Sequence, residues 1–215
     1  MISLVNLTKR FGDNVVLENI NLRFEKGKTY GIVGKNGVGK TVLFKLLCGF
    51  MPPTSGEILV NGQRIGKNID FPVNCGIIIE APGFINKLSG FKNLKLLSRI
   101  NGIISDDKIR EYMFHFGLDP KDKRSVKKYS LGMKQKLGIV QAVMEEQEIL
   151  ILDEPMNSLD EESVTRVRNF LQMVKRSKLI ILASHNKEDI EVLCDEIYLI
   201  ESSSRISNLS LNDSE

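Results

Sequence analysis

The N-terminal part of the chain alternates between apolar and polar residues, with a period of two along residues 2–7 and 15–24. This alternation is typical of half-buried strands, and the Gly-Asp-Asn sequence at residues 12–14 favours a turn that joins them as an antiparallel pair. Residues 149–152 and 179–183 are continuously apolar, as in parallel strands that are covered on both faces. Further short strands are predicted at residues 29–33, 57–60 and 76–79.

A helical period replaces the strand pattern in the middle of the chain. Between residues 89 and about 144, apolar residues such as Leu94 and Leu97 recur at helical spacing. Another helix is predicted at residues 161–175, between the two continuous apolar strands, which gives a βαβ unit. The Ser- and Asn-rich residues 202–215 are expected to form a loosely ordered polar tail. The pattern therefore predicts an α/β protein with a mainly parallel sheet, an antiparallel β part and an inserted helical part.

Length and composition suit one globular domain. The chain has 215 residues, of which 42% are hydrophobic and 27% are charged, close to the averages for globular proteins. The net charge is only +3 and the two signs are mixed along the chain, so nucleic acid is not expected as a partner. The cysteines, Cys48, Cys75 and Cys194, are far apart and show no metal-ligand spacing. The sequence shows neither a signal peptide nor an apolar run long enough to cross a bilayer, so we expect a cytosolic protein.

A glycine-rich sequence between a predicted strand and a predicted helix is the first candidate for chemistry. Residues 34–41 read GKNGVGKT and fit the P-loop pattern G-x-x-x-x-G-K-[ST] in the strand–loop–helix context that the pattern requires. Glycines let backbone N–H groups turn toward phosphate oxygens, and the helix N-terminus adds partial positive charge. Lys40 is expected to reach the β- and γ-phosphates, and the Thr41 hydroxyl to ligate Mg²⁺. The predicted phosphate-binding residues are Gly34, Lys35, Asn36, Gly37, Val38, Gly39, Lys40 and Thr41.

Two adjacent acids follow a predicted buried strand. Residues 149–152 lead directly into Asp153 and Glu154, and ligands of open α/β sheets bind at such carboxyl ends of strands. A Mg²⁺ ion bound to P-loop phosphates also needs a carboxylate, which predicts Asp153 as a metal ligand. Glu154 is then the candidate general base that polarises the attacking water.

A P-loop does not by itself distinguish a GTPase, a kinase, a motor and a transporter ATPase. Residues 186–189 read NKED and match N-K-x-D, the guanine-binding pattern of GTPases. This pattern has only three fixed positions, however, and the acidic strand end lacks the glycine that the GTPase pattern D-x-x-G requires. A GTPase is therefore an alternative that the strand end disfavours.

The sequence YSLGMKQ at residues 129–135 resembles the signature motif of ABC ATPases, usually written LSGGQ. Ser130, Gly132 and Gln135 match in place, whereas Leu131 and the Met-Lys pair after Gly132 depart from the motif. A serine hydroxyl and glycine N–H groups at a helix N-terminus are suited to bind an anion. The order of P-loop, signature and Asp-Glu strand end is that of the ABC ATPase family.

The resemblance covers nearly the whole chain and implies roles for further residues. Phe11 stands where these ATPases carry an aromatic residue that stacks on adenine. Residues 157–160 resemble the D-loop, and His185 stands at the place of the switch histidine, which contacts the γ-phosphate. Glu80, followed by Ala-Pro-Gly-Phe, replaces the glutamine of most ABC ATPases and resembles bacterial ATPases of bacitracin and lantibiotic exporters. Glu80 is therefore a candidate residue near the metal, where its charge would tune the nucleotide site.

The resemblance further implies a two-lobed ATPase that works as a pair. The nucleotide-binding core would span about residues 1–84 and 146–201, and the helical subdomain about residues 85–145. ATP and Mg²⁺ on the P-loop of one subunit would be closed by Ser130 and Gly132 of another, in a homodimer or with a different ATPase subunit.

The implied partner in the membrane is a transmembrane permease subunit. Its contact surface is expected near residues 80–91 and the helices of the insert, with this chain peripheral on the inner face of the cell membrane. The implied activity is ATP-driven export. The resemblance to bacitracin and lantibiotic exporters implies an antibiotic peptide as the cargo. The alternative from another class is a soluble ABC ATPase that clamps a partner outside the membrane.

Overall fold

Strands and helices alternate along most of the chain in the computed structural model, which describes residues 1–80, 83–203 and 205–209. The strands are β1 (Ile2–Phe11), β2 (Asn14–Phe24), β3 (Thr29–Gly34), β4 (Ser55–Val60), β5 (Gln63–Arg64), β6 (Cys75–Ile78), β7 (Ile149–Asp153), β8 (Leu179–Ala183), β9 (Glu196–Ser202) and β10 (Arg205–Leu209). The helices are α1 (Lys40–Leu47), α2 (Gly90–Asn101), α3 (Asp106–His115), α4 (Leu131–Val143), α5 (Glu161–Val174) and α6 (Lys187–Leu193), with 3-10 turns at Val126–Lys128 and Lys175–Ser177.

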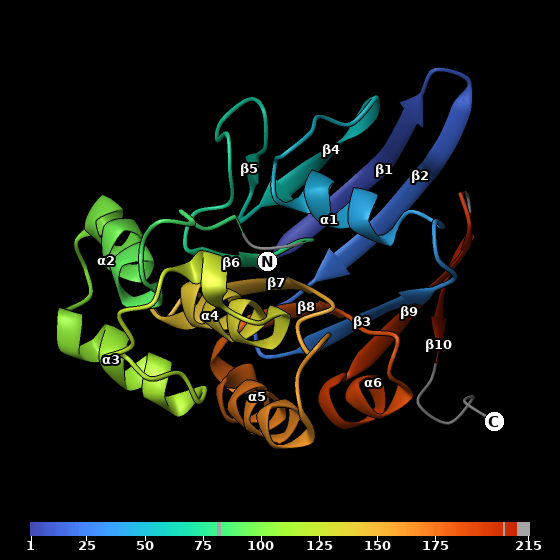
Figure 1. The fold of residues 1–215 in the computed structure, drawn as a ribbon. Coiled ribbons are helices and arrows are strands. Elements are labelled where there is room, and N and C mark those ends of the chain that lie inside the picture. The colour runs from blue at the N-terminus through green and yellow to red at the C-terminus, as the bar shows by residue number, and fades with distance from the viewer. Residues whose placement is uncertain (81–82, 204, 210–215) are drawn as a thin grey trace.

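The strands form two sheets (Figure 1). One sheet is antiparallel and has the order β2-β1-β4-β5. The other has the order β10-β9-β3-β8-β7-β6 and is parallel except for the β9–β10 pair. The P-loop strand β3 and the acidic strand β7 therefore lie on either side of β8, with their carboxyl ends at the same edge.

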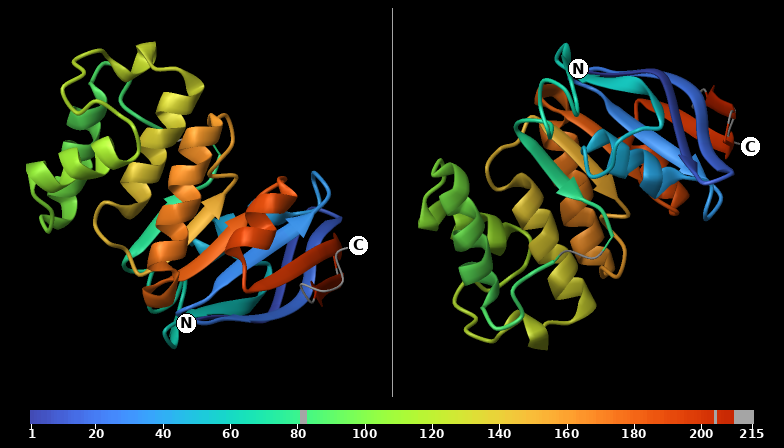
Figure 2. Two further views of the ribbon diagram at one scale, coloured as in Figure 1. Left: turned by 90° about the horizontal axis from the view of Figure 1, so that it is seen from below. Right: turned by 90° about the horizontal axis from the view of Figure 1, so that it is seen from above.

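The larger sheet is covered on both faces, which explains its continuous apolar strands. In β7, Ile149 and Ile151 face a core that contains α1 and the antiparallel sheet. Leu150 and Leu152 face a second core, formed with α4, α5 and α6. Figure 2 shows the same layers, with α1 between the two sheets and α4 and α5 on the opposite face of the larger sheet. Both sets of side chains thus leave water, as the sequence pattern predicts.

The helical part, α2 to α4, lies to one side of the sheets (Figures 1 and 2). Its helices begin at serine caps, because Ser89, Ser105 and Ser130 each accept a hydrogen bond from the backbone N–H three residues later. The end of α4 packs closely on β6, where a Cβ atom on Gly76 would lie 1.8 Å from the carbonyl oxygen of Ala142. Only glycine fits this contact, which holds the helical part against the sheet.

The expectation of a loose tail from residue 202 is wrong for the residues that form β10. Ile206 pairs with Ile200 of β9 in an antiparallel register, and Ile206 and Leu209 pack against the two cores. Ile206 and Leu209 are three positions apart, so their side chains lie on opposite faces of the strand and reach different cores, in a sequence whose composition is otherwise polar. Residues 204 and 210–215 of the predicted tail lie outside the described part of the chain.

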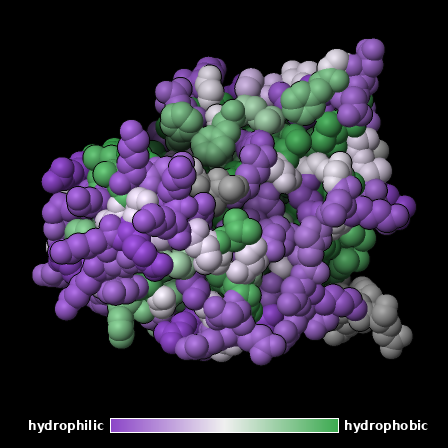
Figure 3. Space-filling view, in the orientation of Figure 1, coloured by the Kyte–Doolittle hydropathy of each residue, from purple (hydrophilic) through white to green (hydrophobic). Residues whose placement is uncertain are grey.

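The face of the molecule shown in Figure 3 is mostly hydrophilic. On the face shown, hydrophobic residues gather over the upper part, where Figure 1 places β1, β4 and α1, whereas the part over α3 is hydrophilic. Among the described residues, no helix combines the length and the apolar character needed to cross a membrane.

Candidate nucleotide-binding site

The glycine-rich loop joins the end of β3 to the start of α1. Gly34 and Gly39 have φ values of 150° and 114°, a conformation that other residues rarely adopt. A Cβ atom would lie 2.6 Å from the Ile200 carbonyl oxygen at Gly34 and 2.9 Å from Val16 at Gly39. Gly39 also occupies the N-cap of α1, so no side chain caps the first N–H groups of this helix. They remain free to bind phosphate oxygens.

Lys40 and Thr41 point from the first turn of α1 toward the loop and toward β7. The ammonium group of Lys40 donates hydrogen bonds to the carbonyl oxygens of Gly34, at 2.7 Å, and Lys35, at 3.2 Å. The hydroxyl of Thr41 donates to Oδ2 of Asp153 at 2.8 Å. The loop is therefore preorganised by its own lysine, and the metal-binding hydroxyl predicted from the sequence already contacts the predicted carboxylate.

The two acids at the end of β7 lie in different surroundings. Asp153 is buried, and burial raises its pKa above the ordinary value, although the hydrogen bond from Thr41 opposes this shift. Burial also raises the pKa of Glu154. Glu154 has a φ of 51°, and this left-handed turn directs its side chain away from the strand toward the loop after β8.

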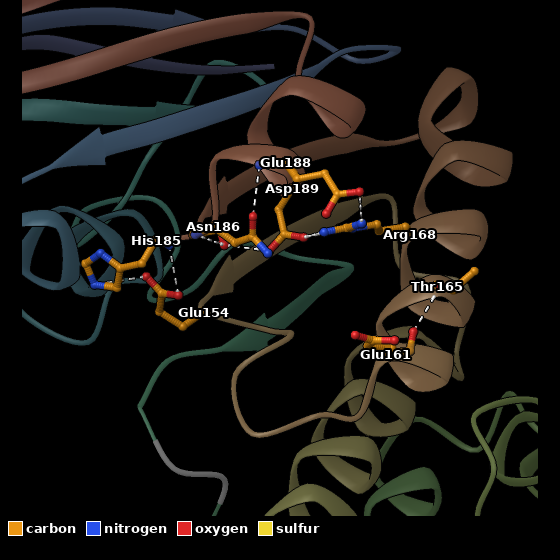
Figure 4. Close-up of polar contacts among 9 residues, drawn as sticks. Glu154, Glu161, Thr165, Arg168, His185, Asn186, Glu188 and Asp189 are labelled. Carbon is orange, nitrogen blue, oxygen red and sulfur yellow. Dashed lines mark hydrogen bonds and ion pairs between the residues drawn. The ribbon is translucent and has the colours of Figure 1, made fainter.

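His185 holds Glu154 from the neighbouring loop (Figure 4). Its backbone N–H donates to Oε2 of Glu154 at 3.2 Å. Its Nε2 lies 3.3 Å from Oε1, but this contact lacks hydrogen-bond geometry, and Oε1 has no hydrogen-bond partner among the described residues. Oε2 of Glu154 is therefore held by the protein, whereas Oε1 is buried beside the imidazole without a hydrogen-bond partner among the described residues.

These groups line one cavity of about 300 Å³. The loop, the first turn of α1, the acids of β7 and the histidine all contribute to its wall, so the structure brings together the main residues predicted from three distant parts of the sequence. The lining residues are Val16, Asn36, Gly37, Gly39, Lys40, Thr41, Val42, Asp153, Glu154 and His185.

The signature residues Ser130, Gly132 and Gln135 do not line this cavity. Ser130 is exposed and caps α4 by accepting a hydrogen bond from the Met133 N–H at 3.2 Å. A Cβ atom on Gly132 would lie 2.8 Å from the carbonyl oxygen of Ser158 in the D-loop. A second cavity, of about 320 Å³, separates the signature helix from the acids and is lined by Glu80, Leu131, Lys134, Gln135, Asp153, Glu154, Asn157 and Ser158. Within one chain, Ser130 and Gly132 therefore do not close the P-loop.

Gln135 has a contact that the sequence did not reveal. Its amide nitrogen donates to the carbonyl oxygens of Glu154, at 3.1 Å, and Pro155, at 2.9 Å. Gln135, which its match to the signature motif makes a candidate nucleotide-binding residue, is thus engaged with the turn after β7 in its own chain. It ties the signature helix to the backbone of the candidate base.

Phe11 and Glu80 lie at the margins of the site. Phe11, at the end of β1, is 49% exposed, and the ammonium group of Lys9 lies 4.9 Å from the centre of its ring. An exposed ring is free to stack on a planar base. Glu80 accepts a hydrogen bond from Lys45 of α1 at 2.6 Å. This ion pair, which the sequence did not suggest, supplies a counter-charge for the glutamate that replaces the usual glutamine.

The N-K-x-D sequence has a structural role that conflicts with guanine binding. Asn186 caps α6 by accepting the N–H of Glu188. Asp189 is only 1% exposed, and its carboxylate accepts hydrogen bonds from Arg168 and Ser184. The GTPase interpretation requires this carboxylate to face a base, and here it faces the protein interior (Figure 4). No motif or spacing marks the contact with Arg168, which lies 21 residues away along the chain.

Comparison with known proteins agrees with this geometry. The family model described as ABC transporter matches residues 17–157. The chain belongs to the ABC transporter family. Among curated relatives, the uncharacterized ABC transporter ATP-binding protein YybJ of Bacillus subtilis is 46% identical over 91% of this chain and 90% of its own length. The bacitracin transport ATP-binding protein BcrA of Enterococcus faecalis is 36% identical over 99% of this chain and 70% of its own length. The lantibiotic transport ATP-binding protein SrtF of Streptococcus pyogenes is 36% identical over 93% and 86%.

Solved ABC structures share the fold. The ATP-binding subunit of an ABC transporter superposes with a TM-score of 0.89 at 25% identity, over 99% of this chain and 91% of that chain. MJ0796, a bacterial ABC transporter cassette solved as a dimer, superposes with a TM-score of 0.87 at 20% identity, over 98% and 99%. The predicted family and fold class are thus confirmed, and the chain is an ATP-binding subunit of the ABC type and an ATP hydrolase.

Proposed function

We propose that this ABC ATPase forms an ATP-closed pair and couples ATP hydrolysis to a transmembrane permease subunit. The observation that carries the proposal is the separation of two half-sites in one chain. The P-loop, Glu154 and His185 share a cavity, whereas the signature serine is exposed and does not line that cavity. In a two-fold symmetric pair, the signature helix of each subunit can contact the P-loop of the other, so the pair contains two complete sites.

In this proposal each residue of the cavity has a separate task. The loop N–H groups and Lys40 bind the phosphates, and His185 contacts the γ-phosphate. Glu154 accepts a proton from the attacking water through its carboxylate. Burial raises the pKa of Glu154, which makes its carboxylate a stronger base than an exposed one. Phe11 stacks on the adenine ring.

The donor set fits Mg²⁺ bound together with phosphates. Among the described residues, no group of three or more His, Cys, Asp or Glu side chains could hold a metal ion alone. Thr41 and Asp153, which contact each other at 2.8 Å, supply a hydroxyl and a carboxylate, and Mg²⁺ is commonly held by one or two carboxylates plus substrate phosphates. The bound ion would neutralise charge that develops on the phosphates. Glu80 stays a candidate ligand whose carboxylate is paired with Lys45.

A groove beside the helical part is suited to the permease. A cavity of about 410 Å³ lies between β6, α2 and α4 and is lined by Phe50, Leu97, Ile100 and Met144 among others. Phe50 and Ile100 are 55% and 78% exposed, so contact with a partner would bury apolar surface. The contact surface expected near residues 80–91 adjoins this groove, although residues 81 and 82 lie outside the described part of the chain.

The relatives' names support a transport role at the inner face of the cell membrane. The proteins named for bacitracin and lantibiotic transport match this chain over 99% and 93% of its length. We therefore propose that the transporter works as an exporter and that its cargo is an antibiotic peptide.

The test is the size of the Glu154→Gln protein with ATP and Mg²⁺, measured by light scattering. Glutamine can still accept the His185 N–H but cannot take a proton from water, so binding is kept and turnover is lost. We expect a dimer only when ATP is present. Glu161→Gln, a change of the same kind at an exposed position of α5, should stay monomeric because it still hydrolyses ATP. A Glu154→Gln monomer saturated with ATP would contradict pairing between copies of this chain.

A further inference from the structure

The loop that carries His185 is held by an unusually complete set of hydrogen bonds. Ser184 and Asn186 flank the histidine, and the Asn186 N–H donates to Oγ of Ser184 at 3.1 Å. The Ser184 hydroxyl in turn donates to Oδ2 of Asp189 at 2.6 Å. Because an ionised carboxylate only accepts hydrogen bonds, the direction of the hydroxyl is fixed. The residues on both sides of His185 are thus tied to one carboxylate in α6.

Asp189 is itself anchored from α5. Its Oδ1 accepts a hydrogen bond from Nε of Arg168 at 2.8 Å, so its two oxygens serve different partners. Arg168 also pairs with Glu188 at 2.9 Å, but the Glu188 side chain is 65% exposed whereas that of Asp189 is 2% exposed. The ion pair with Arg168 uses only Oδ1 of Asp189, so Oδ2 is available for another partner. The second oxygen is used to fix the Ser184 hydroxyl, and through it the loop of the histidine.

The path continues to the candidate base. His185 donates its backbone N–H to Glu154, and the Glu154 N–H donates to the carbonyl oxygen of Ala183 at 3.0 Å. Figure 4 shows Arg168, Asp189 and Asn186 in this order from α5, followed by Glu154 and His185 next to each other. A small rotation of the Ser184–Asn186 loop would therefore move the imidazole and the Glu154 carboxylate together.

We propose that Asp189, held by Arg168 and acting through Ser184, is a positioning residue for His185 and Glu154. This inference rests on the proposed function, because it assumes that His185 and Glu154 act on the γ-phosphate and the water. Asp189 touches neither the cavity nor the nucleotide. It sets the geometry of the groups that do.

The first arm of the test measures steady-state ATP hydrolysis. Asp189→Asn would leave Arg168 with a neutral partner in the interior and can fail to fold, so the informative variant is Ser184→Ala, which keeps the Arg168–Asp189 pair. Displacing catalytic groups by less than 1 Å predicts a fall in kcat of about tenfold with KM for ATP changed less than about twofold. Ser184→Thr keeps a hydroxyl and should restore kcat. Glu188→Gln removes only the exposed partner of Arg168 and should keep the wild-type rate.

The second arm observes the histidine directly and does not depend on activity. The chain has two histidines, so NMR of protein labelled at histidine shows His185 and His115, and His185→Ala assigns them. We expect Ser184→Ala to shift the imidazole signals of His185 and to leave those of His115, in α3, unchanged. Unchanged His185 signals, or wild-type kcat in Ser184→Ala, would overturn the positioning role. Wild-type kcat in His185→Ala would instead refute the proposed task of His185, while a shift in Ser184→Ala would still establish that Ser184 positions it.

Discussion

Ser130 caps a helix and is also proposed to bind a phosphate, and a substitution can distinguish these two roles. Its Oγ accepts the Met133 N–H at 3.2 Å and so caps α4. This leaves the hydroxyl proton free to donate to a phosphate on another subunit. Ser105 is a matched control, because it is also exposed and caps α3 through the Lys108 N–H at the same distance of 3.2 Å. Ser130→Ala and Ser105→Ala therefore remove the same local hydrogen bond from two helices.

The cost of the lost cap can be compared with the cost of a lost phosphate donor. Removing an N-cap hydroxyl destabilises a protein by about 1 kcal/mol, or about fivefold in the unfolding equilibrium. Even a protein stabilised by only about 5 kcal/mol would then stay more than about 99% folded, so activity would be unaffected by unfolding. Removing one preorganised donor to a transition-state oxyanion costs about 100-fold in kcat. The two roles thus differ in their effect on activity by about two orders of magnitude.

The assay combines urea unfolding with ATP hydrolysis at a protein concentration that saturates the rate. Both variants should lose about the same free energy of unfolding, near 1 kcal/mol. Only Ser130→Ala should lose most of its kcat. If Ser130→Ala hydrolysed ATP as fast as Ser105→Ala, the signature would have no phosphate-binding role in this protein, and the assignment of a site between subunits would be refuted.

Three further predictions concern Gly132, Glu154 and Phe11. Gly132→Ala places a Cβ atom 2.8 Å from the Ser158 carbonyl oxygen, so it should lower both the urea midpoint and the ATPase rate, with about 1–3 kcal/mol lost in stability; an unchanged midpoint would show that the D-loop can move aside freely. Burial raises the pKa of Glu154 above its ordinary value of 4.5, so the stability that this carboxyl contributes is present below pH 4.5 and is lost as the pH rises through the raised pKa. At pH 7 the urea midpoint of Glu154→Gln should therefore be higher than that of the wild type, and below pH 4.5 the two midpoints should be equal. Phe11→Ala should raise KM for ATP about tenfold and leave the urea midpoint nearly unchanged, because stacking on a base is worth about 1–3 kcal/mol; an unchanged KM would show that the exposed ring does not contact adenine.

The sequence was sufficient for the parts of the site that depend on neighbours along the chain or on the regular geometry of a parallel sheet. Gly34 to Thr41 span the end of a strand, a loop and the start of a helix as the pattern predicts, and Asp153 lies at the end of a strand whose residues alternate between two cores. Once β7 is placed beside β8, Asp153 lies opposite Ala183. The approach of His185 to Glu154 follows from this register.

Contacts between side chains of distant helices could not be predicted in the same way. Arg168 and Asp189 have no spacing that marks them as partners, and the tertiary packing of α5 against α6 alone brings them together. The same holds for Lys45 and Glu80, which lie on α1 and after β6. The polar composition of residues 202–215 suggested a loose tail, but Ile206 and Leu209 anchor β10 at the edge of the sheet by packing against different cores.

The most direct test of the central claim, that each ATP site lies between two copies of this chain, is to mix two inactive variants. Lys40→Ala removes the phosphate-binding lysine and Ser130→Ala removes the signature hydroxyl. In a mixed pair, one site combines the intact P-loop of one subunit with the intact signature of the other. Random pairing would make about half of the dimers mixed, with one intact site of two, so ATP hydrolysis should recover to about a quarter of the wild-type rate. A mixture that stays as inactive as either variant alone would contradict the claim.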